Sequence, residues 1–365
     1  MALAVIDALR RFLPPFLESG PSLNPDQRRA LWAIEHCRTA TLGGNLYACR
    51  PCGERRFAYH SCNHKACPQC GRDTTRRWVR RELDKRIGAP YFMVTFTLPC
   101  ELRSLFFGPL AKEAYDLFFA AASKALREKL ATPKWLGAQV SGFTGVLHTW
   151  NQQLLFHPHI HFLVPGAGID AKGEVVRVKQ EDYLLPVQVL RKAFRHHFRC
   201  GVQNMPWEID PAVWSKDWGI NIQAFGSGIN AIKYLGAYVS RTAIGNGRIE
   251  SITQEGVTFR WKDRAHGDVT KLQHVSGCEF LRRYLRHVVP RGMRSIRYYG
   301  FCHPAAKRNR ERIGFHTGLP LEAGSSTTVE KEADQASGIP RCPGCQKLMK
   351  RTASFKPAWL PRGPP

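Results

Sequence analysis

The sequence predicts an α+β protein in which helices pack on one face of an antiparallel sheet, preceded by a zinc ribbon. Strand-like and helix-like segments alternate irregularly after residue 90, with a hairpin at their centre, and cysteine pairs with zinc-ligand spacing precede them. The chain of 365 residues is 43% hydrophobic, which is enough for a buried core. We expect an N-terminal helix, a ribbon and a basic helix over 1–89, the sheet domain over 90–316, and over 317–365 a tail that is flexible except around a CxxC pair.

The cysteine spacing predicts the ribbon. Cys49 and Cys52 form one CxxC pair, and Cys67 and Cys70 form a second pair 14 residues later. Each pair can place two thiolates on one Zn²⁺ if a hairpin brings the pairs together. Disulfides are not expected, because we expect a cytosolic protein, and the cytosol keeps thiols reduced.

Further ligand types leave alternatives open. His and Cys residues beside the two pairs are candidates for ligand exchange, for a second zinc site, or for ordinary packing: His36, Cys37, His60, Cys62 and His64. Near the other end of the chain, Cys342 and Cys345 form an isolated CxxC pair. The sequence favours neither of two alternatives there, a metal site or two cysteines that bind no metal.

The remaining elements follow in order. A basic helix is expected from Asp73 to Ala89, including Arg76, Arg77 and Arg80. Residue type and periodicity then predict strands at 91–98, 140–150, 154–165 and 219–225, and helices at 110–130, 187–199 and 229–243. Two further strands, a helix over 278–287 and a strand over 295–301 complete the sheet domain.

The net charge of +25 predicts a polyanionic partner, most commonly nucleic acid. A membrane surface is the rival partner. The apolar stretch over residues 1–17 is too short to span a bilayer and is interrupted by Arg10 and Arg11. We read it as a soluble amphipathic helix that ends at Pro14 and Pro15, so no membrane partner is expected.

A His-x-His motif lies within an apolar strand segment. On a strand, His159 and His161 project from the same face because side chains alternate. Such a pair favours a metal clamp over two isolated core histidines. His148 on the preceding strand is the first choice for a third ligand, and a polar side chain from a helix is the alternative. Few protein ligands leave positions open for phosphate oxygens, which suits Mg²⁺ or Mn²⁺.

Two tyrosines lie four residues apart on a predicted helix. Tyr234 and Tyr238 therefore share one helix face. Aromatic residues at this spacing usually belong to a core. Beside a metal clamp in a basic chain, they become candidates for nucleophiles that attack a phosphodiester and form a phosphotyrosine.

A basic belt follows towards the end of the sheet domain. Its density favours single-stranded nucleic acid over a merely solvated face, since cations track the backbone and aromatic residues stack on bases. The proposed DNA contacts in it are Arg282, Arg283, Arg286, Arg294 and Arg297, with Tyr284, Tyr298, Tyr299 and Phe301 interleaved.

Several long strings resemble the HUH-type rolling-circle transposases of the insertion sequence 91 family. They include "CRTATLGG", "SCNHKACPQC", "LHTWNQQLLFHPHIHFLVPG", "YLGAYVSRTAIGNGRI" and "FLRRYLRHVVPRGMRSIRYYGF". One departure is that Ala66 stands before Cys67 where the family pattern has a histidine.

The resemblance implies a specific fold and reaction. The fold is a five-stranded antiparallel sheet of the RNA-recognition-motif type, with His159 and His161 as metal ligands and Tyr234 and Tyr238 as catalytic residues. The resemblance also implies that the N-terminal cysteines hold zinc in a module that recognises DNA. The reaction nicks single-stranded DNA at a transposon end, forms a 5′-phosphotyrosine and transfers the strand to target DNA. No phosphate-binding GxxxxGK[ST] loop is present, so unwinding would rely on host helicases or replication at the nucleoid.

Three alternatives share some of these features. A plasmid rolling-circle replication initiator or relaxase would use the same chemistry. A zinc-ribbon DNA-binding protein would lack catalysis, and a metal-dependent nuclease would use water and leave no protein–DNA adduct.

Overall fold

The computed structural model describes residues 3–239, 243–263, 266–318 and 339–356, without the side chains of 72–73 and 237–239. The chain divides into two compact units. Unit 1 comprises Met1–Asp73, Ser240–Val288 and Leu321–Pro365, and unit 2 comprises Thr74–Val239 and Val289–Pro320. These boundaries differ from the sequence prediction, because residues 240–288 join the N-terminal part instead of the sheet domain.

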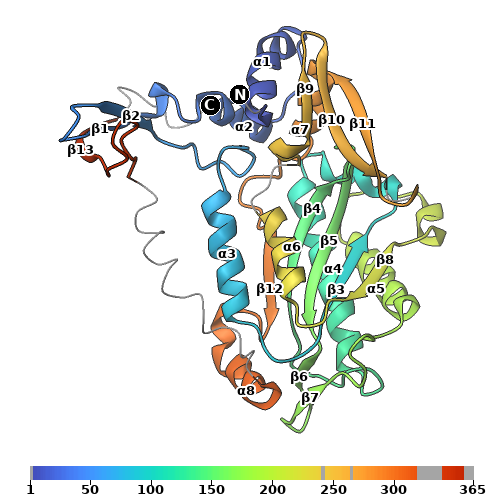
Figure 1. Cartoon of the computed structure of the whole chain (residues 1–365). Helices are drawn as coiled ribbons and strands as arrows, with labels where there is room; N and C mark the ends of the chain where they lie inside the picture. Colours follow the sequence, from blue (N-terminus) through green and yellow to red (C-terminus); the bar gives the residue numbers. More distant parts are fainter. Residues whose placement is uncertain (1–2, 240–242, 264–265, 319–338, 357–365) are drawn as a thin grey trace. The chain divides into compact units, whose positions relative to one another are not determined.

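Unit 2 is built on a five-stranded antiparallel sheet, as predicted (Figure 1). Its strand order is β12 (Ile296–Gly300), β4 (Gly142–Trp150), β5 (Phe156–Pro165), β3 (Tyr91–Thr97) and β8 (Ile220–Ala224). The central strand is therefore β5, which carries the His-x-His motif. The hairpin between β4 and β5 turns at Asn151, whose side chain accepts hydrogen bonds from the backbone of Gln153 and Leu155.

Helices cover both faces of this sheet, which corrects the prediction of one covered face (Figure 1). On one face, Ile160 and Phe162 of β5 pack with α4 (Ala111–Ala131) and α5 (Val187–Val202). On the other, Leu163 packs with α3 (Arg72–Asp84) and α6 (Ile229–Val239). The β5 sequence is apolar on both sides beyond His161, and an apolar strand surface has to be buried.

The remaining elements of unit 2 are short. A two-stranded sheet and a C-terminal helix complete it, together with 3₁₀ turns: β6 (Ala167–Ile169), β7 (Val175–Arg177), α8 (Lys307–Thr317), and turns at Cys100–Phe106, Pro211–Ser215 and Pro304–Ala306. In the described part of the chain, no helix has the length and apolar character that crossing a membrane needs.

Helix α6 begins directly after two glycines in the left-handed region. Gly228 has φ +78°, and a Cβ there would lie 2.5 Å from the Tyr91 ring. Gly226 has φ +51° but open space at the Cβ position. The helix start is therefore fixed by backbone that only glycine adopts easily and by close contact with β3.

Gly228→Ala is expected to destabilise the protein by about 2 kcal/mol, since it adds a steric clash to the backbone strain. Gly226→Ala is the matched control, because it adds the strain alone. Thermal unfolding of both variants measures the difference. Equal losses of stability would show that the Tyr91 contact does not matter.

In the part that the structure describes, unit 1 contains two three-stranded sheets and three helices. Its elements are α1 (Val5–Glu18), α2 (Pro25–His36), β1 (Gly44–Ala48), β2 (Arg55–Tyr59), β9 (Ile249–Ile252), β10 (Gly256–Asp263), β11 (Val269–Ser276), α7 (Gly277–Leu285) and β13 (Lys350–Phe355), with short 3₁₀ turns at Ala40–Leu42 and Asn246–Arg248. The strand orders are β13-β1-β2 and β11-β10-β9, so the segment before α7 forms three strands where the sequence predicted two.

Packing of α7 explains why residues 240–288 belong to unit 1. Gly277 lies so close to Phe12 of α1 that a Cβ would come within 2.0 Å of its ring. The Tyr284 hydroxyl donates to the carbonyl of Ala66 at 2.6 Å. Helix α1 continues through Pro14 and Pro15 to Glu18, contrary to the prediction, and its buried face extends to Phe16. This burial offsets the hydrogen bonds that proline cannot donate.

Candidate functional site

Three histidines of unit 2 form a compact cluster on the sheet. His148 of β4 is directly opposite His159 of β5 in the strand register, and His161 is two residues further along β5. One ring nitrogen from each lies within 4.8 Å of the other two. The structure therefore brings together the three residues that the sequence proposed as a metal clamp.

Hydrogen bonds orient two of the three rings. Nδ1 of His159 lies 2.7 Å from the carbonyl oxygen of His157. A carbonyl oxygen only accepts, so Nδ1 carries the proton and Nε2 presents its lone pair. Nδ1 of His161 lies 2.8 Å from Thr95 Oγ1 of β3. Such outer contacts fix the tautomer and ring direction of a metal-binding histidine.

The electrostatics keep His148 neutral. Burial, together with the neighbouring His161 and His159, lowers the pKa of His148 well below its usual value. A neutral imidazole is the form that binds a metal ion. His157 does not join the cluster. Its Nδ1 lies 3.0 Å from Nη2 of Arg103, and burial followed by this charge lowers its pKa.

Helix α6 places Tyr234, one of the two predicted tyrosines, next to this cluster. The Tyr234 ring meets the His161 ring edge to face, with centroids 6.2 Å apart and planes at 86°. Tyr234 is half-buried, so its phenol is near the cluster but reachable. Tyr238 belongs to the same helix, but its side chain lies outside the described part of the chain.

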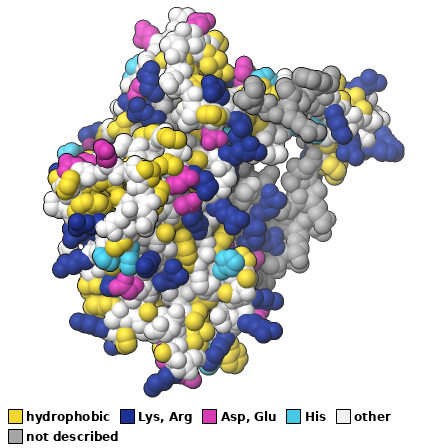
Figure 2. All heavy atoms as spheres, turned by 180° about the vertical axis from the view of Figure 1, so that it is seen from behind, with side chains coloured by type: hydrophobic (Ala, Val, Ile, Leu, Met, Phe, Trp, Pro, Cys, Tyr) yellow, Lys and Arg dark blue, Asp and Glu magenta, His cyan; other side chains and the backbone are white. Residues whose placement is uncertain are grey.

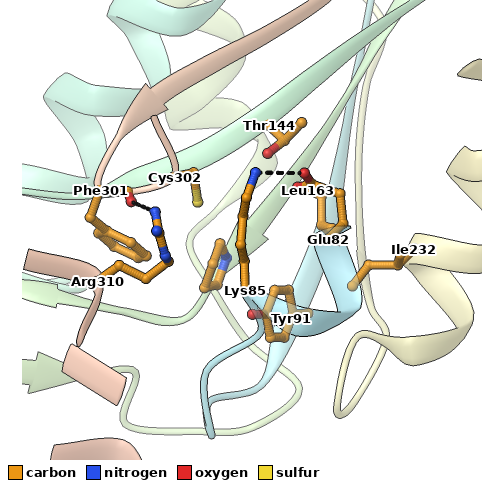
Figure 3. Close-up of a pocket in the computed structure, with 10 residues that line it drawn as sticks. Glu82, Lys85, Tyr91, Thr144, Leu163, Ile232, Phe301, Cys302 and Arg310 are labelled. Atoms are coloured by element: carbon orange, nitrogen blue, oxygen red, sulfur yellow. Dashed lines mark hydrogen bonds and ion pairs between the residues drawn. The ribbon is translucent and has the colours of Figure 1, made fainter. Parts of the chain in front are cut away.

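A small cavity lies on the same sheet face, two residues along β5 from His161 (Figure 3). Lys85, directly after α3, pairs with Glu82 at 3.1 Å, and Arg310 of α8 donates to the carbonyl of Phe301. Burial raises the pKa of the adjoining Cys302 thiol to about 12. The cavity volume of about 20 Å³ holds a single water and not a nucleotide. The cavity is therefore a small void between packed side chains and not a nucleotide-binding site.

Eight cysteines of unit 1 form two clusters of four. The first contains Cys37, Cys62, Cys67 and Cys70, with Sγ atoms of Cys37 and Cys62 each 3.7 Å from that of Cys70. With Zn–S bonds of about 2.3 Å, the sulfurs of a tetrahedral site are about 3.8 Å apart. The thiols of Cys62 and Cys67 lower the pKa of Cys70 by hydrogen bonding.

The second cluster joins the two ends of the chain. Cys49 and Cys52 meet Cys342 and Cys345, and the Sγ atoms of Cys49 and Cys345 are 3.5 Å apart. The backbone N–H of Lys347 and the neighbouring thiols lower the pKa of Cys345 to about 7. Strand β13 pairs with β1 and so completes a three-stranded ribbon with the β1–β2 hairpin.

This arrangement corrects the predicted ligand set. The Cys49 pair and the Cys67 pair do not share a cluster, because β13 brings Cys342 and Cys345 beside the β1–β2 turn. Cys37 and Cys62, left open in the sequence, complete the other cluster. Four thiols suffice there, so the histidine absent at Ala66 is not needed. Residues 340–356, around the CxxC pair that the sequence predicted as an exception to the flexible tail, are thus part of the ribbon.

The arginines proposed as DNA contacts fall in both units. Arg76 and Arg77 of α3 are exposed, and Arg80 is half-buried. In α7, Arg282 and Arg283 both pair with Glu279, at 2.7 and 2.8 Å. Other members of the set differ in exposure: Arg286 and Arg294 are exposed, whereas Arg297 pairs with Asp116 and lies 4.2 Å over the Phe119 ring.

Two aromatic residues of the predicted belt, Tyr284 and Phe301, are buried, which corrects their proposed stacking role, whereas Tyr298 and Tyr299 are half-buried. Tyr284 is 2% exposed and Phe301 is 1% exposed. The Tyr298 hydroxyl accepts a hydrogen bond from Trp78 Nε1 at 2.9 Å, and the Tyr299 ring packs on Phe143. The rings of Tyr284 and Phe301 are therefore not available to bases in this structure.

Comparison with known proteins agrees with this layout. The family model described as "Transposase zinc-binding domain" matches residues 8–98, and the model described as "Putative transposase" matches residues 142–310. The chain is 34% identical to "Putative transposase y4qJ" of Sinorhizobium fredii over 94% of this chain and 93% of that protein.

The name of a second relative mentions an insertion sequence. The chain is 29% identical to "Transposase for insertion sequence element IS801" of Pseudomonas savastanoi pv. phaseolicola, over 73% of this chain and 67% of that protein. No solved structure matches the chain. The chain therefore belongs to the insertion sequence 91 family of transposases and has that family's zinc-binding domain in its N-terminal part.

Proposed function

We propose that this transposase nicks single-stranded DNA at transposon ends through a 5′-phosphotyrosine and transfers the strand in rolling-circle transposition. The proposal rests on one observation above all: the histidine cluster and Tyr234 lie on the same face of the sheet, with the His161 and Tyr234 rings in contact. The fold we propose is the HUH endonuclease fold, with its sheet of the RNA-recognition-motif type. The five-stranded antiparallel sheet, with His159 and His161 on its central strand and His148 on the neighbouring strand, supports this.

The donor set fits a catalytic divalent ion. His148, His159 and His161 supply three nitrogens and leave positions open for phosphate oxygens. Nitrogen donors suit Mn²⁺ better than Mg²⁺, which prefers oxygen ligands. When bound, such an ion would polarise a phosphate oxygen and offset developing negative charge.

The chain's own residues then perform the transfer. The phenol oxygen of Tyr234 or Tyr238 attacks the scissile phosphorus, an O–P bond forms, and the bond from phosphorus to the 3′ oxygen breaks. The phenol proton ends on the released 3′ hydroxyl. Attack by another 3′ hydroxyl reverses these steps and joins the strand to target DNA. Two tyrosines allow two strands to be held in turn, and host factors would separate the duplex.

Basic side chains are proposed to hold the DNA. Arg76, Arg77 and Arg80 follow one another along α3, where two of them are exposed. The other proposed contacts, of which Arg282, Arg286 and Arg294 are exposed, are Arg282, Arg283, Arg286, Arg294 and Arg297. Phosphate contacts of this kind position a strand without reading its sequence.

We also propose that both cysteine clusters bind structural zinc. Sulfur separations of 3.5 to 3.7 Å match the edge of a tetrahedral site. Three of the CxxC turns are closed by a residue with positive φ: Gly53 (+70°), Gly71 (+93°) and Gln346 (+58°). Such turns aim successive backbone N–H groups at the thiolates.

The proposed chemistry is tested with a labelled single-stranded oligonucleotide that carries the element's end, incubated with protein and Mn²⁺. We expect a labelled covalent adduct on a denaturing gel that is lost with EDTA and in Tyr234→Phe/Tyr238→Phe. Cleavage without an adduct would indicate a hydrolytic nuclease. Binding without cleavage would indicate a DNA-binding protein.

Thr95→Val is expected to weaken Mn²⁺ binding by about 10- to 100-fold, because His161 loses the hydroxyl that orients its ring. Mn²⁺ titration of adduct formation measures this change. Thr97→Val, two residues along β3, is the matched control. Equal Mn²⁺ requirements in both variants would contradict the role of Thr95.

A further inference from the structure

The zinc ribbon has one packed face and one exposed face. On the packed face, Tyr47 and Met349 contact the cysteines Cys49, Cys342 and Cys345. On the opposite face, strand register places two aromatic rows side by side: Phe57 with Leu46 and Ala353, then Tyr59 with Gly44 and Phe355. The ribbon is thus a sheet that packs on its cysteine cluster with one face only, and the face with Phe57, Tyr59 and Phe355 lies outside that packing.

The aromatic rings on the exposed face contact one another. Phe57 and Tyr59 are 55% and 40% exposed, and their ring planes are within 9° of parallel. Phe355 meets both rings edge to face, with centroids 5.9 and 6.2 Å away. Gly44 stands between Tyr59 and Phe355 in the register and adds no side chain over the rings. Large exposed apolar surfaces of this kind usually mark a binding site.

The charge around these rings indicates the partner. The next row of the same face is Arg55, Ala48 and Lys350, which places two exposed cations beside Phe57. The ribbon segments 44–59 and 340–356 contain one acidic residue, Glu54, against a large set of cations: Arg50, Arg55, Arg56, Arg341, Lys347, Lys350, Arg351 and Lys356. Figure 2 shows Lys and Arg side chains with hydrophobic ones among them on the ribbon, at the right of the view.

We infer that this face, defined by Phe57, Tyr59, Phe355, Arg55 and Lys350, binds unpaired bases of single-stranded DNA by stacking while the cations contact its phosphates. A sheet with exposed aromatic rings and flanking cations suits single strands, whose base faces are free. In a duplex those base faces are stacked on one another. The inference rests on the proposed function, since it names the strand that the ribbon would hold for the transposase.

The test measures binding by the full-length, zinc-loaded protein. Fluorescence anisotropy with a labelled single strand should show about 5- to 100-fold weaker binding for Phe57→Ala/Tyr59→Ala. The slope of log affinity against log salt should stay unchanged, because no cation is lost. A duplex of the same sequence should bind as in the wild type. Phe57→Trp should retain single-strand binding, and Phe315→Ala is the control for an exposed ring elsewhere.

The outcomes separate this inference from the proposed chemistry. Wild-type adduct formation with unchanged single-strand binding in Phe57→Ala/Tyr59→Ala would overturn the inference alone. Equal losses on single strand and duplex would also overturn it, as would a change of oligomeric state in the variant, which would assign the face to a second copy. Absence of an adduct in the wild type with selective loss of single-strand binding would contradict only the proposed chemistry. Zinc content equal to that of the wild type checks that the ribbon is folded.

Discussion

His161→Ala is expected to lower Mn²⁺-dependent adduct formation by about 10³-fold, because it removes one of three nitrogens from the cluster. Loss of the bound ion removes several kcal/mol of charge stabilisation, and each 1.4 kcal/mol is a factor of ten in rate. His148→Ala and His159→Ala should behave similarly. The measurement is the rate of adduct formation on a labelled single strand across a Mn²⁺ titration.

His157→Ala is the matched control for this prediction. Its side chain lies on the same strand but contacts Arg103, and the carbonyl that accepts from His159 is retained in the variant. The rate should stay within about tenfold of the wild type, as for a residue outside the metal site. Similar losses in His157→Ala and His161→Ala would contradict a three-histidine metal site.

The double variant Cys342→Ser/Cys345→Ser is expected to lose half of the bound zinc. The structure assigns these thiols to the Cys49 and Cys52 cluster, while four other cysteines form the first cluster. A thiolate pair contributes half of a closed structural site, so one ion should leave and the other remain. Metal analysis of the purified full-length protein gives the ratio of zinc to chain.

Two further variants complete this experiment. Cys62→Ser/Cys67→Ser should lose the other ion, and Cys200→Ser, an exposed cysteine outside both clusters, should lose none. Unchanged zinc content in Cys342→Ser/Cys345→Ser would contradict the ribbon that joins the two ends. It would also restore the predicted pairing of Cys49 and Cys52 with Cys67 and Cys70.

Local patterns predicted the site well where strand and helix periodicity determine the geometry. His159 and His161 share a face because side chains alternate along a strand, and the short turn at Asn151 brings His148 opposite them. The antiparallel sheet was predicted from strand patterns, whereas its five strands were implied by the family resemblance. The location of Tyr234 next to His161 needed the tertiary packing of α6, which the glycine pair before it permits.

Long-range pairing was the part that local patterns could not determine. The choice between Cys67 and Cys342 as partners of Cys49 depends on the pairing of β13 with β1, which lie more than 300 residues apart in the sequence. An unpaired CxxC near the end of the chain was the available signal. Likewise, the sequences of the ribbon and of the basic belt both contain arginines next to aromatic residues. Only burial shows that Tyr284 is internal and Phe57 is exposed.

The central claim is that the tyrosines of α6 carry the DNA strand beside the histidine cluster. The most direct measurement is mass spectrometry of the Mn²⁺-dependent adduct after nuclease and trypsin digestion. Cleavage after Lys233 and Arg241 releases residues 234–241, which include both Tyr234 and Tyr238. We predict a 5′-linked nucleotide phosphate on one of these two tyrosines. A phosphonucleotide on any other peptide, or product DNA with no attached peptide, would contradict the account.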